Sequence, residues 1–417
     1  MNHRSRVPGS RFRLALRAGA LLAGALLGCS APGLSTQSPG APSPGASVGE
    51  SEPSPTSAGA GEPWAESSFS PRPVESGVSI ASCADSEQSL LAAARSVAEE
   101  AARGRVWDIA DVLTRIRAAG GPFVWPRVWT LQGSSFDAPQ ARASLEAWLD
   151  QSPRLGQRRC GAVQSEGASG ARVLAAVVID AIADLDPLPT RVRLGQWLRL
   201  RARLLISAHG AETVLLGPHG APRTIPTELR ASEVRSVFSL DQPGMWRIQV
   251  VLGTETGPRP AVEAWAFVDE EPNSSTAQAP APGEDSGAPA AATEDEQRAL
   301  LWTMLNAARR SEQRVPVRRD PGLDQLAQAH AEAMRQTRQT AHDVGQGLPS
   351  ERLRQAGVAA ALVGENVAHA GSLARAHRAL WDSPAHRGTL LEPGFERVGL
   401  GVAFEDEAVW VCELFTN

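Results

Sequence analysis

The sequence contains no tyrosine and no lysine. All of the positive charge in its 417 residues is therefore arginine, and the arginines are scattered along a chain whose formal net charge is only -5. A nucleic-acid-binding protein is expected to carry a basic stripe or a strongly basic domain, and neither is present. We therefore expect no nucleic-acid partner. The length predicts two to three domains.

Long hydrophobic runs are also missing, apart from a short one near the N-terminus. Five arginines in the first 17 residues precede the uncharged run AGALLAGALLG, which has the length of a signal-peptide core. It is shorter than the about 20 residues that a transmembrane helix needs. The run ends in Leu26-Leu27-Gly28-Cys29, which resembles the lipobox of bacterial lipoproteins.

The lipobox resemblance implies cleavage before Cys29, lipidation of that residue and attachment to the cell envelope. Because Ser30 follows the cysteine, and not Asp, the resemblance also implies sorting to the outer membrane. The alternative is an ordinary secretory peptide in which the cysteine is accidental. Either interpretation predicts an exported protein.

Composition divides the rest of the chain into linkers and folded blocks. The linkers consist largely of Ser, Pro, Gly, Ala and Thr, and such segments cannot bury enough apolar surface to offset the entropy of ordering. The predicted segments are a signal peptide at 1–28, a disordered tether at 29–78, an α/β domain at 79–186, a β-sandwich at 187–270, a linker at 271–292 and a C-terminal domain at 293–417.

Residues 187–270 contain short β-type runs separated by Gly-Pro turn signals. Trp246, Ile248 and Val250 alternate on one expected face, with Arg247 and Gln249 on the other. Short alternating strands at this spacing predict a β-sandwich of immunoglobulin-like type. The segment DQPGMWRIQV also resembles a strand of extracellular immunoglobulin-like modules.

The last 125 residues carry the clearest helix signals. Thr293-Glu294-Asp295-Glu296 is a capping box. Asp320-Pro321 combines an N-cap with a first-turn proline, and a third helix is expected to begin near Ser372. Two strands, Val398–Phe404 and Ala408–Thr416, are predicted to close the chain.

Six segments of this block occur in a distinctive order: LNAARR, DPGLDQLAQAHAEAM, AHDVGQGLPSERLRQAG, VGENVAHAG, LWDSPAHRGTLLEPGFERVGLGVAF and VWVCELF. They resemble the blocks of the CAP superfamily, which comprises cysteine-rich secretory proteins, antigen 5 and pathogenesis-related proteins, in its bacterial extracellular (SCP-like) form. The resemblance covers about residues 294–417 and implies an α-β-α sandwich with a cleft.

Members of that superfamily place two histidines and two glutamates in the cleft, where some bind a divalent metal such as zinc. Carried over by motif, the equivalent residues are His342, Glu365 of GEN and His386 of SPAHR. Asp382 and Ser383 stand where the eukaryotic pattern has its second glutamate, so three ligands remain. Two imidazoles and a carboxylate suit Zn²⁺. The alternative is a hydrogen-bonded polar cluster that fixes the cleft wall.

The other histidines are expected to lie outside this cluster. His330 falls on the buried stripe of its helix, and His377 falls on the same side as other apolar residues of its own helix. His369 is not expected at the site. His209 and His219 lie near turns and are expected to be solvated.

Residues 79–186 contain segments that run parallel to C-terminal ones. LTRIRAAGGPFVWPRVWTLQG parallels SERLRQAGVAAALVGENVAHAG, and LEAWLDQSPRLGQRRCGAV parallels AHRALWDSPAHRGTLLEPGFERVGLGV. These parallels predict a second, degenerate CAP-like domain. In this register Val128 replaces Glu365, and Arg154 and Leu155 follow the Ser-Pro pair in place of a histidine. The alternative is an unrelated α/β domain with a chance WxxxSP pattern.

Cysteine is scarce, with four residues in the chain. Cys29 is the predicted lipidation site. Cys83 and Cys160 lie in one predicted domain and are expected to form a disulfide in an oxidising compartment. Cys412 alternates with apolar residues of the last strand and is expected to pack as a small buried hydrophobe.

Two classes of function remain open. The first is a membrane-anchored, surface or periplasmic CAP-domain lipoprotein that is a non-enzymatic binding module for lipid, peptide or cell-envelope glycan. It would require no cofactor and hold at most a weak divalent-metal site. The second is a metal-assisted, peptidase-like hydrolase that uses His342, Glu365 and His386. The sequence has no HExxH motif, and its GxSxG match, GASVG at 45–49, lies in the predicted disordered tether and forms no nucleophile elbow, which favours binding.

Overall fold

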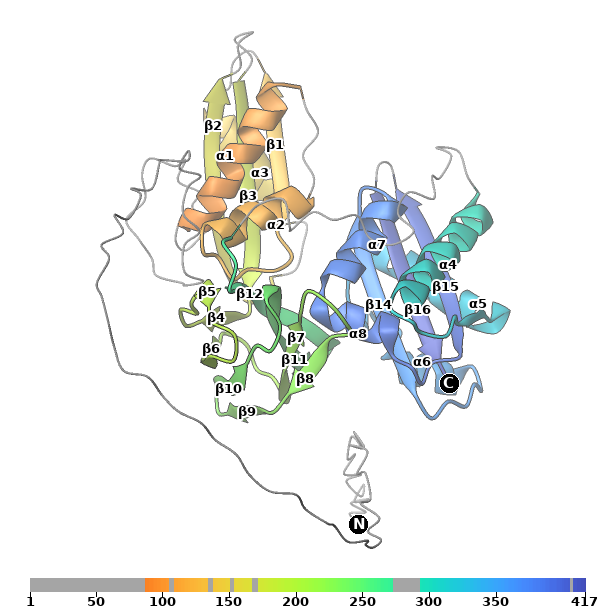
Figure 1. Ribbon diagram of the computed structural model, residues 1–417. Helices are drawn as coiled ribbons and strands as arrows, with labels where there is room; N and C mark the ends of the chain where they lie inside the picture. Colours follow the sequence, from red (N-terminus) through yellow and green to blue (C-terminus); the bar gives the residue numbers. More distant parts are fainter. Residues whose placement is uncertain are drawn as a thin grey trace, which may run out of the picture. The chain divides into compact units, whose positions relative to one another are not determined.

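The structure is a computed structural model, and it describes residues 87–104, 109–133, 138–150, 154–166, 172–272, 293–405 and 408–417 (Figure 1). The predicted signal peptide and tether, Cys29, Cys83 and most of the linker lie outside the described residues. All described residues belong to one compact unit. None of the helices among them is long and apolar enough to cross a membrane.

The N-terminal block places helices on both faces of a small sheet. Its elements are α1 (Gln88–Ala102), α2 (Ile109–Ala118), β1 (Arg127–Gly133), α3 (Ala138–Leu149), β2 (Gln157–Glu166) and β3 (Arg172–Ala181). The strands are antiparallel in the order β1-β3-β2. Val177 of β3 packs with α1 and α2, whereas Val178 packs with α3, because successive strand residues point to opposite faces.

The middle block consists of two sheets that share one core. Its strands are β4 (Ala183–Leu185), β5 (Arg191–Val192), β6 (Trp197–Leu204), β7 (Gly210–Leu216), β8 (Arg223–Ile225), β9 (Thr227–Arg230), β10 (Glu233–Ser239), β11 (Gly244–Thr254) and β12 (Gly257–Val268). The sheet orders are β4-β6-β10-β9 and β5-β12-β11-β7-β8. Residues of both sheets form a single hydrophobic cluster.

The first of these strands begins earlier than the sequence indicates. The sequence predicts that the preceding domain covers residues 79–186, but Ala183–Leu185 pair with β6 and so belong to the middle block. Trp246, Ile248 and Val250 are buried in the shared core, as their alternation predicts. Arg247 and Gln249 lie on the other face of β11 and are buried as well, because they contact the C-terminal block.

The C-terminal block has the elements α4 (Glu294–Ser311), β13 (Arg318–Arg319), α5 (Pro321–Thr337), α6 (Pro349–Gln355), β14 (Val363–Ala370), α7 (Leu373–Asp382), α8 (Pro384–Leu391), β15 (Arg397–Glu405) and β16 (Ala408–Thr416). The capping box of Thr293 and Glu296, the Asp320 cap with Pro321 and the Ser372 cap are all present, which confirms three predicted helix starts.

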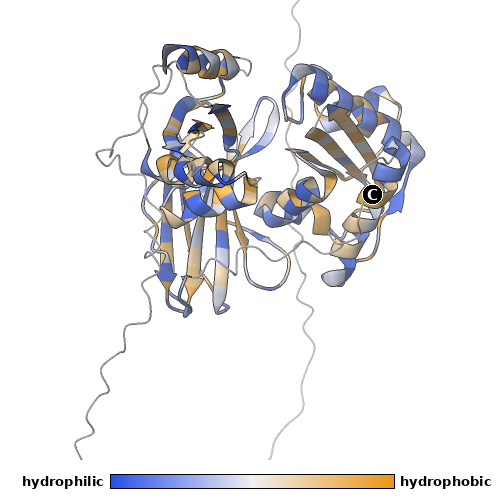
Figure 2. Ribbon diagram, turned by 90° about the horizontal axis from the view of Figure 1, so that it is seen from above, coloured by the Kyte–Doolittle hydropathy of each residue, from blue (hydrophilic) through white to orange (hydrophobic). Residues whose placement is uncertain are grey.

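The sheet of this block, in the order β13-β15-β16-β14, lies between two helical layers. One face packs with α4, α7 and α8 around Leu305, Leu380 and Phe415, and the other packs with α5 around Ala327 and Leu414. Figure 2 shows the hydrophobic colour on the strands between these helices. The result is the three-layer α-β-α arrangement that the sequence predicts.

Glycines allow one helix in each α/β block to lie directly on its sheet. A Cβ at Gly399 of β15 would come within 2.1 Å of the Leu323 carbonyl carbon in α5. A Cβ at Gly161 of β2 would come within 2.2 Å of the Leu90 carbonyl carbon in α1. Contacts this close exclude any side chain, so only glycine fits either position.

Candidate functional site

Glu365 lies on the edge strand β14, on the face that α5 covers, and it is buried. Gly364 precedes it and lets the strand approach Phe395, whose ring would be 2.4 Å from a Cβ at that position. The carboxylate accepts a hydrogen bond from His342 Nδ1 at 2.9 Å, and Arg352 of α6 forms a buried ion pair with its other oxygen. Two of these three residues were predicted from the sequence.

Two further side chains complete this group. The Cys412 thiol donates to Glu365 Oε2 at 3.3 Å, and His330 Nε2 lies 3.8 Å from Glu365 Oε1. Both were predicted as buried core residues and both are buried, but they also contact the carboxylate. We call Glu365, His330, His342, Arg352 and Cys412 the Glu365 cluster.

The charges of the cluster keep Glu365 ionised. Burial acts to raise the pKa of this carboxyl, but the His342 hydrogen bond and the Arg352 charge outweigh it and hold the pKa below its usual value. Burial, together with the Glu365 charge, raises the pKa of the Cys412 thiol well above its ordinary range. Cys412 is therefore a thiol at neutral pH and not an activated nucleophile.

His386 lies in the first turn of α8, after Ser383, which ends α7 and begins α8, and Pro384 at the first helical position. Its Nδ1 is 2.9 Å from the Ser383 hydroxyl, and the ring of Trp125 from the N-terminal block meets the imidazole edge to face at a centroid distance of 5.7 Å. Burial, followed by the charge of His342, lowers the pKa of His386 to about 3. His386 is therefore neutral at physiological pH.

The donor set does not fit a bound metal in this arrangement. The Glu365 carboxylate is already paired with Arg352 and His342, and no hydrogen bond among the described residues joins it to the side chain of His386. Across the described ranges, no group of three or more His, Cys, Asp or Glu side chains is placed to hold an ion. Metal binding by His342, Glu365 and His386 stays a prediction, and the geometry favours the hydrogen-bonded alternative.

A second buried polar pair, Asn366 and Glu413, lies on the other face of the sheet from the Glu365 cluster and is hydrogen-bonded to the backbone of His386. Asn366 Nδ2 donates to the backbone carbonyl of His386 at 3.2 Å and to Glu413 Oε2 at 3.1 Å. Burial raises the pKa of Glu413 to about 7, against the lowering effect of the Asn366 hydrogen bond. Sequence reasoning missed this pair, as it missed Arg352.

The remaining histidines lie where the sequence places them. His369 stacks on Trp410 at 4.4 Å, near the far end of β14 from Glu365. His377 is buried on α7, on the side of Leu373 and Trp381. His209 and His219 are exposed.

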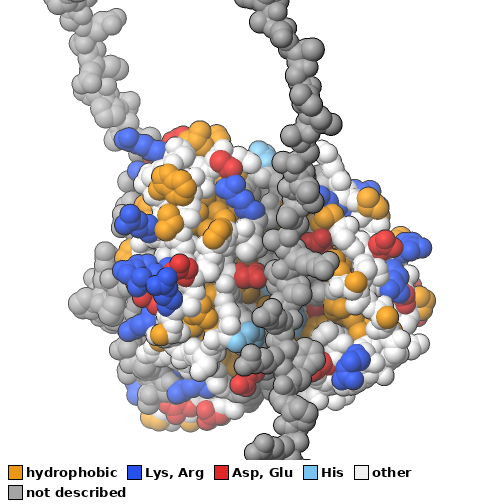
Figure 3. Space-filling model, turned by 90° about the horizontal axis from the view of Figure 1, so that it is seen from below, with side chains coloured by type: hydrophobic (Ala, Val, Ile, Leu, Met, Phe, Trp, Pro, Cys, Tyr) orange, Lys and Arg blue, Asp and Glu red, His pale blue; other side chains and the backbone are white. Residues whose placement is uncertain are grey.

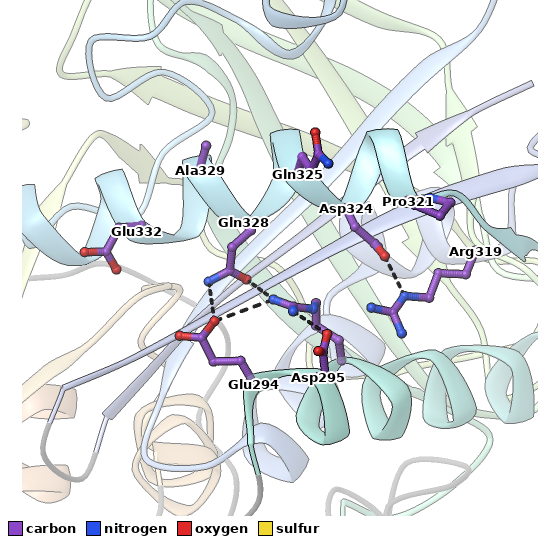
Figure 4. A pocket seen from close by; sticks show the side chains of 10 residues that line it. Glu294, Asp295, Arg319, Pro321, Asp324, Gln325, Gln328, Ala329 and Glu332 are labelled. Atoms are coloured by element: carbon purple, nitrogen blue, oxygen red, sulfur yellow. Dashed lines mark hydrogen bonds and ion pairs between the residues drawn. The ribbon is translucent and has the colours of Figure 1, made fainter.

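A polar groove of about 640 Å³ runs between α4 and α5 (Figure 4). Its charged side chains pair with each other: Arg298 binds Asp295, and Arg319 binds Asp324. Because these charged groups are already paired, we assign no ligand to the groove. On the face shown in Figure 3, basic and acidic side chains are interspersed rather than separated by sign.

The fold and the site together define a three-layer α-β-α domain with a buried polar cluster, and the comparisons with known proteins give it a family. Residues 302–414 match the model of the cysteine-rich secretory protein family, CAP. The C-terminal block is therefore a CAP domain. No curated protein sequence matches the chain.

Several solved structures resemble parts of the chain. An outer surface protein of Borrelia burgdorferi is 20% identical over 30% of this chain and 96% of its own, with a TM-score of 0.29. An extracellular protein of Bacillus anthracis with an SCP domain is 18% identical over 43% of this chain and 66% of its own, with a TM-score of 0.27. A cysteine-rich secretory protein of Staphylococcus aureus is 11% identical over 65% of this chain and 89% of its own, with a TM-score of 0.25.

Proposed function

We propose that this protein is exported, lipid-anchored through Cys29, and binds a ligand in its CAP domain without altering it chemically. The signal-peptide pattern supports export. Cys160 supports it independently, because it is disulfide-bonded and structural disulfides persist in oxidising compartments. The printed descriptions of the Borrelia and Bacillus proteins, an outer surface and an extracellular protein, agree with this location.

The observation that carries a binding role is the pairing of Glu365 with Arg352. A general base needs a free lone pair, and a metal ligand needs one too. Here the side chain is only 1% exposed, one oxygen accepts from His342, and the other meets both a guanidinium and the Cys412 thiol, so burial keeps the remaining lone pairs from solvent. The carboxylate therefore serves as the fixed centre of a rigid cleft wall, which suits recognition of lipid, peptide or cell-envelope glycan.

Hydrolysis and metal binding can be tested on the detergent-solubilised chain. We expect no Zn²⁺-dependent cleavage of a casein substrate above the rate of the His342→Ala variant. We expect at least one of three probes to bind: phosphatidylglycerol vesicles, peptidoglycan sacculi or unfolded casein. Any Zn²⁺ that binds should be lost in His386→Ala and retained in His377→Ala. Zn²⁺-dependent turnover that disappears in Glu365→Gln would establish the hydrolase instead.

We also propose that the N-terminal block is a degenerate second copy of the CAP domain. Its β1-β3-β2 order repeats the β14-β16-β15 order of the C-terminal sheet. Val128 of β1, Val177 of β3 and Gly161 of β2 form one cross-strand row.

Glu365, Leu414 and Gly399 form the corresponding row of the C-terminal sheet, which supports the register expected from the sequence. Each row also ends at a glycine beneath the third residue of a helix, Leu90 of α1 or Leu323 of α5.

The same register pairs three of the five residues of the Glu365 cluster with apolar ones. Val97 corresponds to His330, Val128 to Glu365 and Ala175 to Cys412, and all three replacements pack within one hydrophobic cluster. The architecture therefore does not require the cluster. Its presence in the C-terminal copy supports a role in ligand recognition.

For the middle block we propose an immunoglobulin-like module. Two mainly antiparallel sheets over one core, with a buried Trp246, support this class.

A further inference from the structure

A line of hydrogen bonds and one ion pair leads from the N-terminal block through the middle block to His386. Arg117 and Glu263 lie 3.6 Å apart, and Glu263 accepts a hydrogen bond from Gln249 Nε2 at 2.8 Å. Gln249 Oε1 is 3.4 Å from the Ser383 hydroxyl, which is 2.9 Å from His386 Nδ1. We call these five residues the Gln249 relay. All except the half-buried Ser383 are buried.

The amide of Gln249 has one orientation that satisfies its neighbours. Its Nε2 donates to Glu263, a carboxylate that only accepts, and its Oε1 accepts the backbone N–H of Ala385 at 3.1 Å. The flipped amide would set oxygen against the carboxylate and nitrogen against the Ala385 N–H. Two hydrogen bonds would become repulsive contacts between buried groups, so Oε1 faces Ser383.

The orientation of this amide decides where the Ser383 proton lies. A hydroxyl has one proton to donate, and the Gln249 oxygen can only accept it. Ser383 therefore donates to Gln249, and a lone pair of its hydroxyl oxygen accepts from His386 Nδ1–H. The opposite assignment would leave the Ser383 and Gln249 oxygens facing each other, 3.4 Å apart, without a proton between them.

Trp125 is held beside His386 by the strand that carries part of the relay. Its backbone φ of 59° is an unusual conformation for a bulky side chain and persists only where the surroundings impose it. The surroundings here are β12: Phe123 forms a bridge with Val262, and Glu263 N–H donates to the Pro122 carbonyl at 2.8 Å.

We propose that the middle block fixes His386 as its Nδ1–H tautomer through Gln249 and Ser383, so that Nε2 is a hydrogen-bond acceptor. No hydrogen bond within the described part of the chain reaches that nitrogen. A ligand that meets it must supply an N–H or O–H group, as a sugar hydroxyl or a neutral amide does. This ligand chemistry rests on the proposed binding function, and Gln249 and Ser383 are positioning residues.

The tautomer can be read directly from ¹⁵N NMR spectra of the full chain labelled in histidine, with the His386 signals assigned by their loss in His386→Asn. We expect a protonated Nδ1 and an unprotonated Nε2. Gln249→Leu and Ser383→Ala should shift His386 toward the Nε2–H form, which free imidazole side chains favour. Ser383→Thr, which keeps the hydroxyl, should retain the original pattern.

Gln196→Leu, at an exposed position of the middle block outside the relay, is the matched control and should change nothing. An Nε2–H tautomer in the unaltered chain overturns the proposal, whether or not any variant folds. So does an unchanged His386 signal in folded Gln249→Leu and Ser383→Ala. Because no ligand is present, a failure here is distinct from a failure of the binding function.

Discussion

At the scale of single residues, motifs indicated candidate residues but not their partners. His342, Glu365 and His386 stand in recognisable segments, and of the three only His342 and Glu365 are hydrogen-bonded to each other among the described residues. The role of Arg352 could not be predicted, because a charged residue on a short helix is expected to be exposed to solvent. Only the tertiary structure shows that α6 lies beside β14 and brings Arg352 to Glu365. The same holds for Glu413, whose burial depends on the helices that cover the sheet.

The pairing of Arg352 with Glu365 gives the first prediction. Arg352→Met should lower the free energy of unfolding by about 3–5 kcal/mol, because it leaves the buried Glu365 carboxylate without its guanidinium partner. The double variant with Glu365→Gln should recover most of that loss. Arg354→Met, an exposed position on the same helix, is the control in urea unfolding. Equal losses for both arginines would contradict the argument.

Glu413 gives a pH dependence. Its pKa is raised from 4.5 to about 7 in the folded state, so folding favours the protonated form. The stability from this group is complete below pH 4.5 and is lost as the pH rises through about 7, which amounts to about 3 kcal/mol. Urea unfolding at pH 5 and pH 8 should show this loss in the parent chain and not in Glu413→Gln. The same pH dependence in both chains would contradict it.

At the scale of elements, long helices were predictable and short strands were not. The helices α4, α5 and α7 carry caps and apolar stripes that local sequence reveals. Strands of two to four residues, such as β9 and β13, exist only because a neighbouring strand bonds to them. The order of strands in each sheet is likewise set by long-range packing, which a single sequence did not disclose.

The close approach of α5 to β15 makes glycine obligatory there. Gly399→Ala should destabilise the chain by about 3 kcal/mol or more, at the upper end of overpacking penalties, because the methyl group meets the α5 backbone. Gly388→Ala, with no atom within 4 Å of its Cβ, should be neutral or stabilise α8 by up to about 1 kcal/mol. Thermal unfolding of the two variants checks this; indistinguishable midpoints would refute it.

At the scale of the whole molecule, composition predicted the succession of blocks but not where they meet. β4 begins at Ala183, four residues before the predicted start of the middle block at residue 187, since β3 runs almost directly into it. Contacts between blocks, such as the ion pair of Arg247 with Asp382, could not be predicted from the local sequence around either residue.

The disulfide of Cys160 is expected to join Cys83. The other described cysteine, Cys412, is free, so it is not the partner. Closing a loop of about 77 residues stabilises by about 4 kcal/mol in the loop-entropy model. Peptide mapping without reductant should recover the Cys83 and Cys160 peptides joined. A Cys160 peptide joined to any other cysteine would exclude this pairing.

The anchor prediction concerns Cys29. Cys29→Ala should release the chain from the membrane fraction, because several acyl chains hold a protein far more firmly than one chain or none. Fractionation of cells followed by immunoblotting measures this, with Cys412→Ala as a cysteine variant outside the signal region. Equal membrane recovery of parent and Cys29→Ala would remove the lipoprotein interpretation.

The Gln249 relay has an evolutionary consequence. Each member depends on its neighbour to donate or to accept, so a substitution at one position forces the next to reorient or lose its partner. Such positions resist change one at a time. In an alignment of three-block relatives, the columns of Arg117, Glu263, Gln249 and Ser383 should vary together, across two block boundaries, while neighbouring surface columns drift independently.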